Sequence, residues 1–208
     1  MKSLRVQHVL KAIAAGAVLT FAAAAPASAH VGLGAVHTFS QGFLHPLSGI
    51  DHIIAMVAVG LYAANLGGRA LWLVPSAFVG TMILGGMLGY YGWSLPMVEA
   101  GIGLSVVIMS MAIALGVRLP TVGAMALVGT FALFHGHAHG NEGIGLGFAF
   151  LPYAGGFVVA TILLHISGLA LGAGLNQLGT TQSRFFNKLA GALGAIAGIS
   201  LLAGLLTA

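Results

Sequence analysis

The fold is decided by apolar runs such as ALWLVPSAFVGTMILGGMLGYY, residues 70–91, which contains no charged side chain. A helix needs about 20 apolar residues to cross the hydrocarbon core of a bilayer. Five more runs approach this length, and none alternates polar and apolar residues as a barrel strand would. The six runs cover residues 46–66, 70–91, 96–117, 120–138, 147–174 and 183–206. We therefore expect an all-α polytopic membrane protein, built as a six-helix transmembrane bundle.

The composition excludes several other classes of protein. Of the 208 residues, 5% are charged and 59% are hydrophobic, and the mean hydropathy is +1.05. Soluble domains carry about 25% charged residues, so a soluble enzyme, a disordered chain and a nucleic-acid binder are all excluded. Cysteine is absent, which removes thiolate metal sites. No glycine cluster is followed by Lys-Ser or Lys-Thr, so we expect no bound nucleotide.

The N-terminus has the pattern of a secretory signal peptide over residues 1–29. A basic stretch, an apolar stretch and a small-x-small motif follow one another: Lys2, Arg5 and Lys11, then 12–25, then Ala27-Ser28-Ala29. Cleavage would leave a mature domain of residues 30–208, in which the terminal amine and imidazole of His30 could chelate a metal ion. An uncleaved first helix is the alternative.

The cations indicate the orientation of the bundle. Every Lys and Arg of the mature chain falls in alternate connections between the expected spans: Arg69, Arg118, Arg184 and Lys188. Cytoplasmic loops carry such an excess of cations, so both ends of the mature chain are expected outside. Small residues four apart also predict close helix packing, at Gly85/Gly89, Gly168/Gly172 and Gly194/Gly198.

Ionisable side chains inside a membrane are candidates for function, and a first cluster occupies HPLSGIDH, residues 45–52. Pro46 is expected to begin the helix, with His45 at its mouth. Asp51 and His52 lie in the next turns, and Met56 follows one turn below His52. Imidazole and carboxylate ligands suit Ni²⁺, Co²⁺ or Zn²⁺. The alternative is an Asp–His pair that only holds two helices together.

A second cluster occupies FHGHAHGNE, residues 134–142. His135 and His139 share a helix face, Glu142 lies three residues beyond, and His137 points elsewhere. Two glycines in this stretch are expected to weaken the helix, which would place the ligands on an unwound end. The topology brings both clusters to the same side of the membrane. The alternative is a solvent-exposed loop that binds metal only casually.

Three further residues are weaker candidates. Glu99 lies near the same side and either completes the site or is a helix-terminal Glu near water. His165 is deep in the fifth run, where a hydrogen bond to a backbone carbonyl is favoured over a role as a transit ligand. His37 precedes the first span and could pass metal inward.

Both clusters resemble the motifs of the HupE/UreJ family of nickel/cobalt permeases. The resemblance rests on His45-Pro46…Gly49…Asp51-His52 and on Phe134-His135-Gly136-x-Ala138-His139-Gly140-x-Glu142, and it extends over the mature chain. It implies uptake of nickel or cobalt across the bacterial cytoplasmic membrane, for metalloenzymes such as hydrogenase or urease. The residues it implicates are His45, Asp51, His52, His135, His139 and Glu142.

The leading hypothesis is a secondary, ATP-independent permease and not an enzyme. Ni²⁺ (or Co²⁺) would be its transported substrate, no cofactor is expected, and its partners would be the divalent ion and the lipid bilayer. Assembly into a homo-oligomer stays open. The rival hypothesis is an intramembrane metal-dependent hydrolase, although the chain has no H-E-x-x-H motif.

Overall fold

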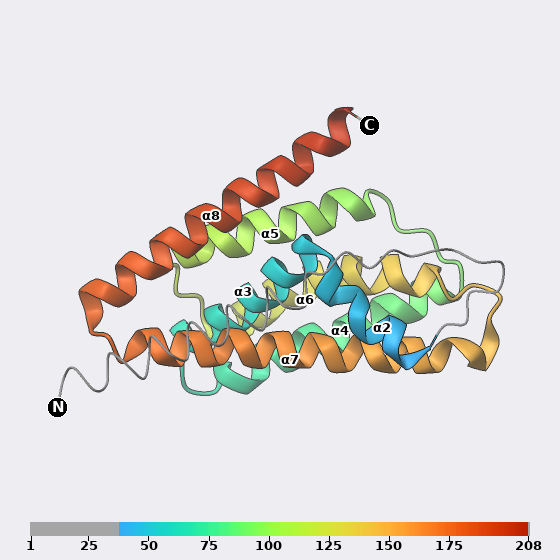
Figure 1. The fold of residues 1–208 in the computed structure, drawn as a ribbon, viewed down its shortest axis with the longest axis horizontal. Helices are drawn as coiled ribbons and strands as arrows, with labels where there is room; N and C mark the ends of the chain where they lie inside the picture. The colour runs from blue at the N-terminus through green and yellow to red at the C-terminus, as the bar shows by residue number, and fades with distance from the viewer. Residues whose placement is uncertain (1–37, 208) are drawn as a thin grey trace.

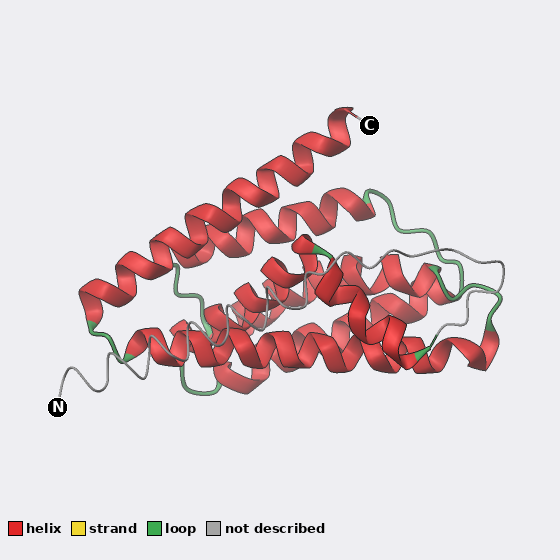
Figure 2. Ribbon diagram, viewed as in Figure 1, coloured by secondary structure: helices red, strands yellow, loops and turns green. Residues whose placement is uncertain are grey.

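The computed structural model describes residues 38–207. The expected signal peptide, its boundary at residues 29/30, and the candidate ligands His30 and His37 lie outside these described residues. Within residues 38–207 the chain forms helices and short connections and contains no strand (Figure 2). The expectation of an all-α fold is confirmed for this part of the chain.

All six apolar runs are helical, although the first is divided between two helices. The elements in chain order are α2 Phe39–Ser48, α3 Ile50–Leu66, α4 Ala70–Tyr90, α5 Val98–Leu115, α6 Thr121–Asn141, the 3-10 helix η1 Gly147–Phe150, α7 Leu151–Asn176 and α8 Thr180–Thr207. Among these, five helical segments are long and apolar enough to cross a membrane, and α2 and α3 together make a sixth candidate that is bent by 83°. The protein is therefore an integral membrane protein with five or six candidate spans.

The start of the first span differs from the sequence expectation. Pro46 does not begin a helix but lies inside α2, which starts at Phe39. Thr38 provides the earlier start, because its side chain accepts a hydrogen bond from the Gln41 backbone while the Gln41 side chain bonds back to Thr38. The chain breaks instead at Gly49, whose extended backbone separates α2 from α3. His45 therefore belongs to a separate helix that meets α3 at a sharp angle.

The end of α6 also differs from expectation. Gly136 and Gly140 do not unwind the helix, which continues to Asn141. A Cβ atom at either position would overlap a backbone carbonyl of α4, at Met82 for Gly136 and at Gly86 for Gly140. The glycines thus allow the two backbones to touch, and this contact offsets their low helix propensity.

The bundle consists of three closely packed helix pairs, α3 with α7, α4 with α6 and α5 with α8 (Figure 1). A glycine from each predicted small-residue pair faces the partner helix: Gly168 meets Val57 on α3, Gly85 meets Leu133 on α6, and Gly194 meets Ser110 on α5. The predicted packing role of these glycines is confirmed. Large apolar side chains such as Trp72, Leu193 and Ile196 remain exposed on the outer faces, as expected of a lipid-facing surface.

Charge is segregated between the two ends of the bundle. Asp51, Glu99 and Glu142 stand at the start of α3, the start of α5 and the end of α6, which share one end with the histidine clusters. We call this the histidine end. The opposite end, here the arginine end, holds all four cations of residues 38–207: Arg69, Arg118, Arg184 and Lys188.

Candidate metal centre

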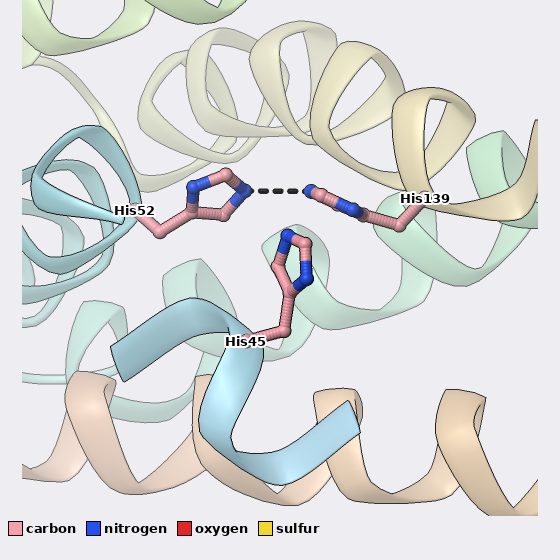
Figure 3. A group of neighbouring side chains, drawn as sticks. All are labelled: His45, His52 and His139. Carbon is pink, nitrogen blue, oxygen red and sulfur yellow. Dashed lines mark hydrogen bonds between the residues drawn. The ribbon is translucent and has the colours of Figure 1, made fainter. Parts of the chain in front are cut away.

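Three histidines from three helices converge at the histidine end (Figure 3). His45 comes from α2, His52 from α3 and His139 from α6, and one nitrogen of each lies within 4.8 Å of the others. The Nε2 atoms of His52 and His139 are 2.7 Å apart. The His45 ring lies across the His139 ring, with centroids 4.4 Å apart. We refer to these residues as the three-histidine site.

Two carboxylates stand behind the rings and not among the three nitrogens. Asp51 Oδ1 lies 3.0 Å from His52 Nδ1, close enough for an ion pair although the geometry is not that of a hydrogen bond. Glu142 Oε1 lies 3.0 Å from His139 Nδ1, which donates a hydrogen bond to it. Such partners fix the orientation of a metal-binding imidazole and raise its basicity. Asp51 and Glu142 are thus placed to orient the rings of His52 and His139.

The contact between the Nε2 atoms of His52 and His139 is a hydrogen bond in this structure, and the same two atoms can hold a cation. If each Nδ1 carries the proton that faces its carboxylate, each Nε2 presents a bare lone pair to the other. Two lone pairs at 2.7 Å repel one another unless a proton or a metal ion lies between them. Imidazole is a ligand suited to nickel, copper and zinc. The donor set therefore fits a borderline divalent ion.

Glu142 is held in its charged form. Burial alone would raise the pKa of this carboxyl, but hydrogen bonds from His139 and from the Tyr153 hydroxyl more than offset that effect and lower the pKa below its usual value. The Tyr153 hydroxyl donates to Glu142 Oε2 over 2.8 Å. A negative charge is therefore maintained beside His139.

His135 and His137 have different surroundings. The His135 ring lies 5.2 Å from the His52 ring, one helical turn deeper than His139. Its Nε2 is 2.9 Å from Ser105 Oγ. His137 instead places its Nε2 2.6 Å from the Trp93 carbonyl, so it faces away from the three-histidine site as the spacing predicts.

The remaining candidates are not brought into the site. Met56 is fully buried in the hydrophobic core below His52. Glu99 is exposed in the first turn of α5, and no hydrogen bond or ion pair joins it to another described residue. His165 lies deep in α7, and neither of its ring nitrogens reaches the expected carbonyl.

Sequence reasoning did not identify two aromatic contributors from α7. Tyr153 holds Glu142, and the Phe157 ring lies 4.5 Å from the His139 ring between centroids. Both belong to a long apolar run, where nothing in the sequence separates them from residues that face lipid. A largely apolar cavity of about 480 Å³ leads to His139 along Phe157 and Tyr90.

The fold and the site define an all-helical membrane protein with a histidine-rich, metal-competent centre at one end of its bundle. Comparison with known proteins agrees: the chain belongs to the HupE/UreJ family, because the family model described as HupE / UreJ protein matches residues 17–201. The chain is 47% identical over 179 residues to Protein HupE of Rhizobium leguminosarum bv. viciae, which covers 86% of this chain and 91% of that protein. No solved structure gives a significant match.

Proposed function

We propose that this protein is an ATP-independent permease that takes up Ni²⁺ (or Co²⁺) across the bacterial cytoplasmic membrane, supplying metalloenzymes such as hydrogenase or urease. The single observation that carries the proposal is the convergence of three imidazole nitrogens within 4.8 Å, from three helices of a membrane bundle. Membership of the HupE/UreJ family supports the same assignment. The metal ion is the substrate, and no resident cofactor is needed.

The site is suited to capture an ion and also to release it. Asp51 and Glu142 place two negative charges around the imidazoles, which matches the charge of a divalent ion. The ligand nitrogens themselves are neutral, so the bound ion is not trapped as it would be by several direct carboxylate ligands. A membrane potential contributes about 4.6 kcal/mol per 100 mV to the entry of a divalent cation, which is a sufficient driving force without ATP.

The hydrolase alternative is less well supported. A metal-dependent hydrolase needs a general base close to the metal-bound water. The carboxylates nearest to the three-histidine site, Asp51 and Glu142, are both engaged with its imidazoles. Glu99 is exposed on another helix, which leaves no carboxylate beside the site in that role.

The proposal is tested by uptake of radioactive nickel into cells that express the chain, with cobalt and zinc as competitors. We expect uptake to exceed that of empty cells and to depend on His52 and His139. A protein that retains one tightly bound metal without raising the metal content of the cell would contradict transport and favour the hydrolase.

A further inference from the structure

His165 is an unusual residue for the centre of a membrane bundle. Its side chain is 1% exposed, and both ring nitrogens lack a hydrogen-bond partner among the described residues. A buried polar group without a partner destabilises the folded protein, and leucine would avoid that cost. A ligand that binds the ring during the working cycle would offset it.

His135 offers a second free nitrogen nearby. Its Nε2 contacts Ser105, whose hydroxyl donates to the Ile102 carbonyl over 2.6 Å. Ser105 has only one proton to donate, so its oxygen accepts from His135 Nε2–H. This fixes the tautomer and leaves His135 Nδ1, which is buried and has no partner, as a bare lone pair.

Phe78 of α4 joins the two histidines. Its ring centroid lies 5.9 Å from that of His135 and 4.9 Å from that of His165. Phe78 is 1% exposed, so both imidazoles pack against the same buried ring. Helices α4 and α7 also touch one turn away from the contact between Phe78 and His165. There the hydroxyl of Thr161 on α7 lies 3.8 Å from the sulfur of Met82 on α4.

These residues lie at successive depths below the three-histidine site. His135 is one helical turn from His139, which corresponds to about 6 Å along the bundle. The α7 backbone at His165 packs against Gly60 of α3, and Gly60 is eight residues beyond His52, or about 12 Å deeper. Steps of this size let one ion be passed between imidazoles.

A cavity of about 500 Å³, lined by both polar and apolar side chains, lies beyond His165 at the arginine end. Tyr62, Asn65 and Asn176 line it from α3 and α7. Arg118, Arg184 and Lys188 line the same cavity. Their positive charge disfavours retention of a metal ion there, which suits an exit.

We propose that His165 and the free Nδ1 of His135 form an inner metal-binding site, which receives the ion from the three-histidine site and passes it toward this cavity. The inference rests on the proposed transport function. It assigns to His165 a role that the three-histidine site does not require.

The test uses the full-length protein in proteoliposomes, with Ni²⁺ flux and equilibrium Ni²⁺ binding both measured per inserted molecule. His165→Leu removes both ring nitrogens and keeps an apolar side chain. We expect its flux to fall at least ~10-fold while binding at the three-histidine site stays within about two-fold. Leu164→Ala, at a buried neighbour on the same helix, controls for a packing defect and should keep its flux per molecule.

Normal flux in His165→Leu would overturn the inner site, as would a loss of flux accompanied by loss of binding at the three-histidine site. If His165→Leu does not insert, His165→Asn replaces it: a ~10-fold loss of flux supports the proposal and normal flux overturns it. If the wild-type protein carries no flux, the proposed function fails on its own. In that case the inner site still predicts that the wild-type protein binds a second, weaker Ni²⁺ ion that His165→Leu does not bind. The same number of bound Ni²⁺ ions per molecule in both proteins would overturn the inner site.

Discussion

At the scale of the residue, the partner of each imidazole distinguishes histidines that look alike in the sequence. His139 directs Nδ1 to the Glu142 carboxylate and leaves Nε2 facing His52. His137, only two residues earlier, uses Nε2 to contact the Trp93 carbonyl. The first arrangement presents a metal ligand, whereas the second joins the connection before α5 to α6.

This difference predicts opposite effects of two alanine substitutions. His139→Ala removes a ligand itself, whereas the loss of a residue that only positions a ligand typically lowers metal affinity or activity ~10–100-fold. We therefore expect nickel uptake per inserted molecule to fall by more than this, with membrane abundance near that of the wild type. His137→Ala should keep uptake per molecule but lower stability by about 0.5–1.5 kcal/mol, because the part-buried hydrogen bond between its Nε2 and the Trp93 carbonyl is lost. Uptake and thermal unfolding of both variants check this. Equal uptake by the two would remove His139 from the proposed site.

Glu142 allows the positioning role of a carboxylate to be measured directly. Glu142→Gln keeps the side-chain size and a hydrogen-bond acceptor for His139 but removes the charge. We expect nickel affinity to fall about 10–100-fold, while the fold is retained because the Tyr153 hydroxyl can accept a hydrogen bond from the amide NH2 group that replaces Oε2. Titration calorimetry of the purified protein measures the affinity. Unchanged affinity would show that Glu142 does not act through His139.

At the scale of the element, the backbone contact between α4 and α6 sets the position of His139. Gly140 lies next to His139 and touches the carbonyl of Gly86 on α4. The same contact keeps α6 helical through Asn141, so that His135 and His139 lie on one face. A glycine that reads as a weak point in the sequence is thus a packing surface in the bundle.

Gly140→Ala should therefore destabilise the protein by about 1–3 kcal/mol, because the added methyl group overlaps a backbone carbonyl that cannot move alone. Gly155→Ala is a matched control on α7, where an added Cβ meets nothing within 4 Å. It should be neutral or slightly stabilising, because alanine favours a helix. Thermal unfolding in detergent compares the two variants. A Gly140→Ala protein as stable as the control would contradict this account of the contact.

The sequence predicts helices well here, because run length and the absence of charge depend only on local composition. It could not predict the break at Gly49, since Pro46 is the stronger local signal and the cap at Thr38 lies outside the apolar run. The spacing of His135, His137 and His139 predicted which rings share a face. The convergence with His45, and the place of the carboxylates behind the rings, depend on contacts between α2, α3 and α6 that no local pattern records.

At the scale of the whole molecule, the bundle has an electrostatic direction. The carboxylates of residues 38–207 lie at the histidine end and the cations lie at the arginine end. A cation is attracted to the first end and repelled from the second. We take the helices α3 to α8 as six crossings. Helix α5 starts at the histidine end, and α8 runs antiparallel to it, with Leu202 beside Gly103. The end of α8 therefore lies on the same side as the start of α3.

The segregation of charge predicts which end faces the cytoplasm. Lys and Arg are retained on the cytoplasmic side during insertion, so the arginine end should face inward and the histidine end outward. A reporter fused after Ala208 would then fold and function only in the non-cytoplasmic compartment, whereas one inserted beside Arg118 would function only in the cytoplasm. The paired fusions control for expression, because both measure the same chain. Cytoplasmic activity of both fusions would contradict this arrangement, because it would mean that one of α6, α7 and α8, the helices between Arg118 and Ala208, does not cross the bilayer.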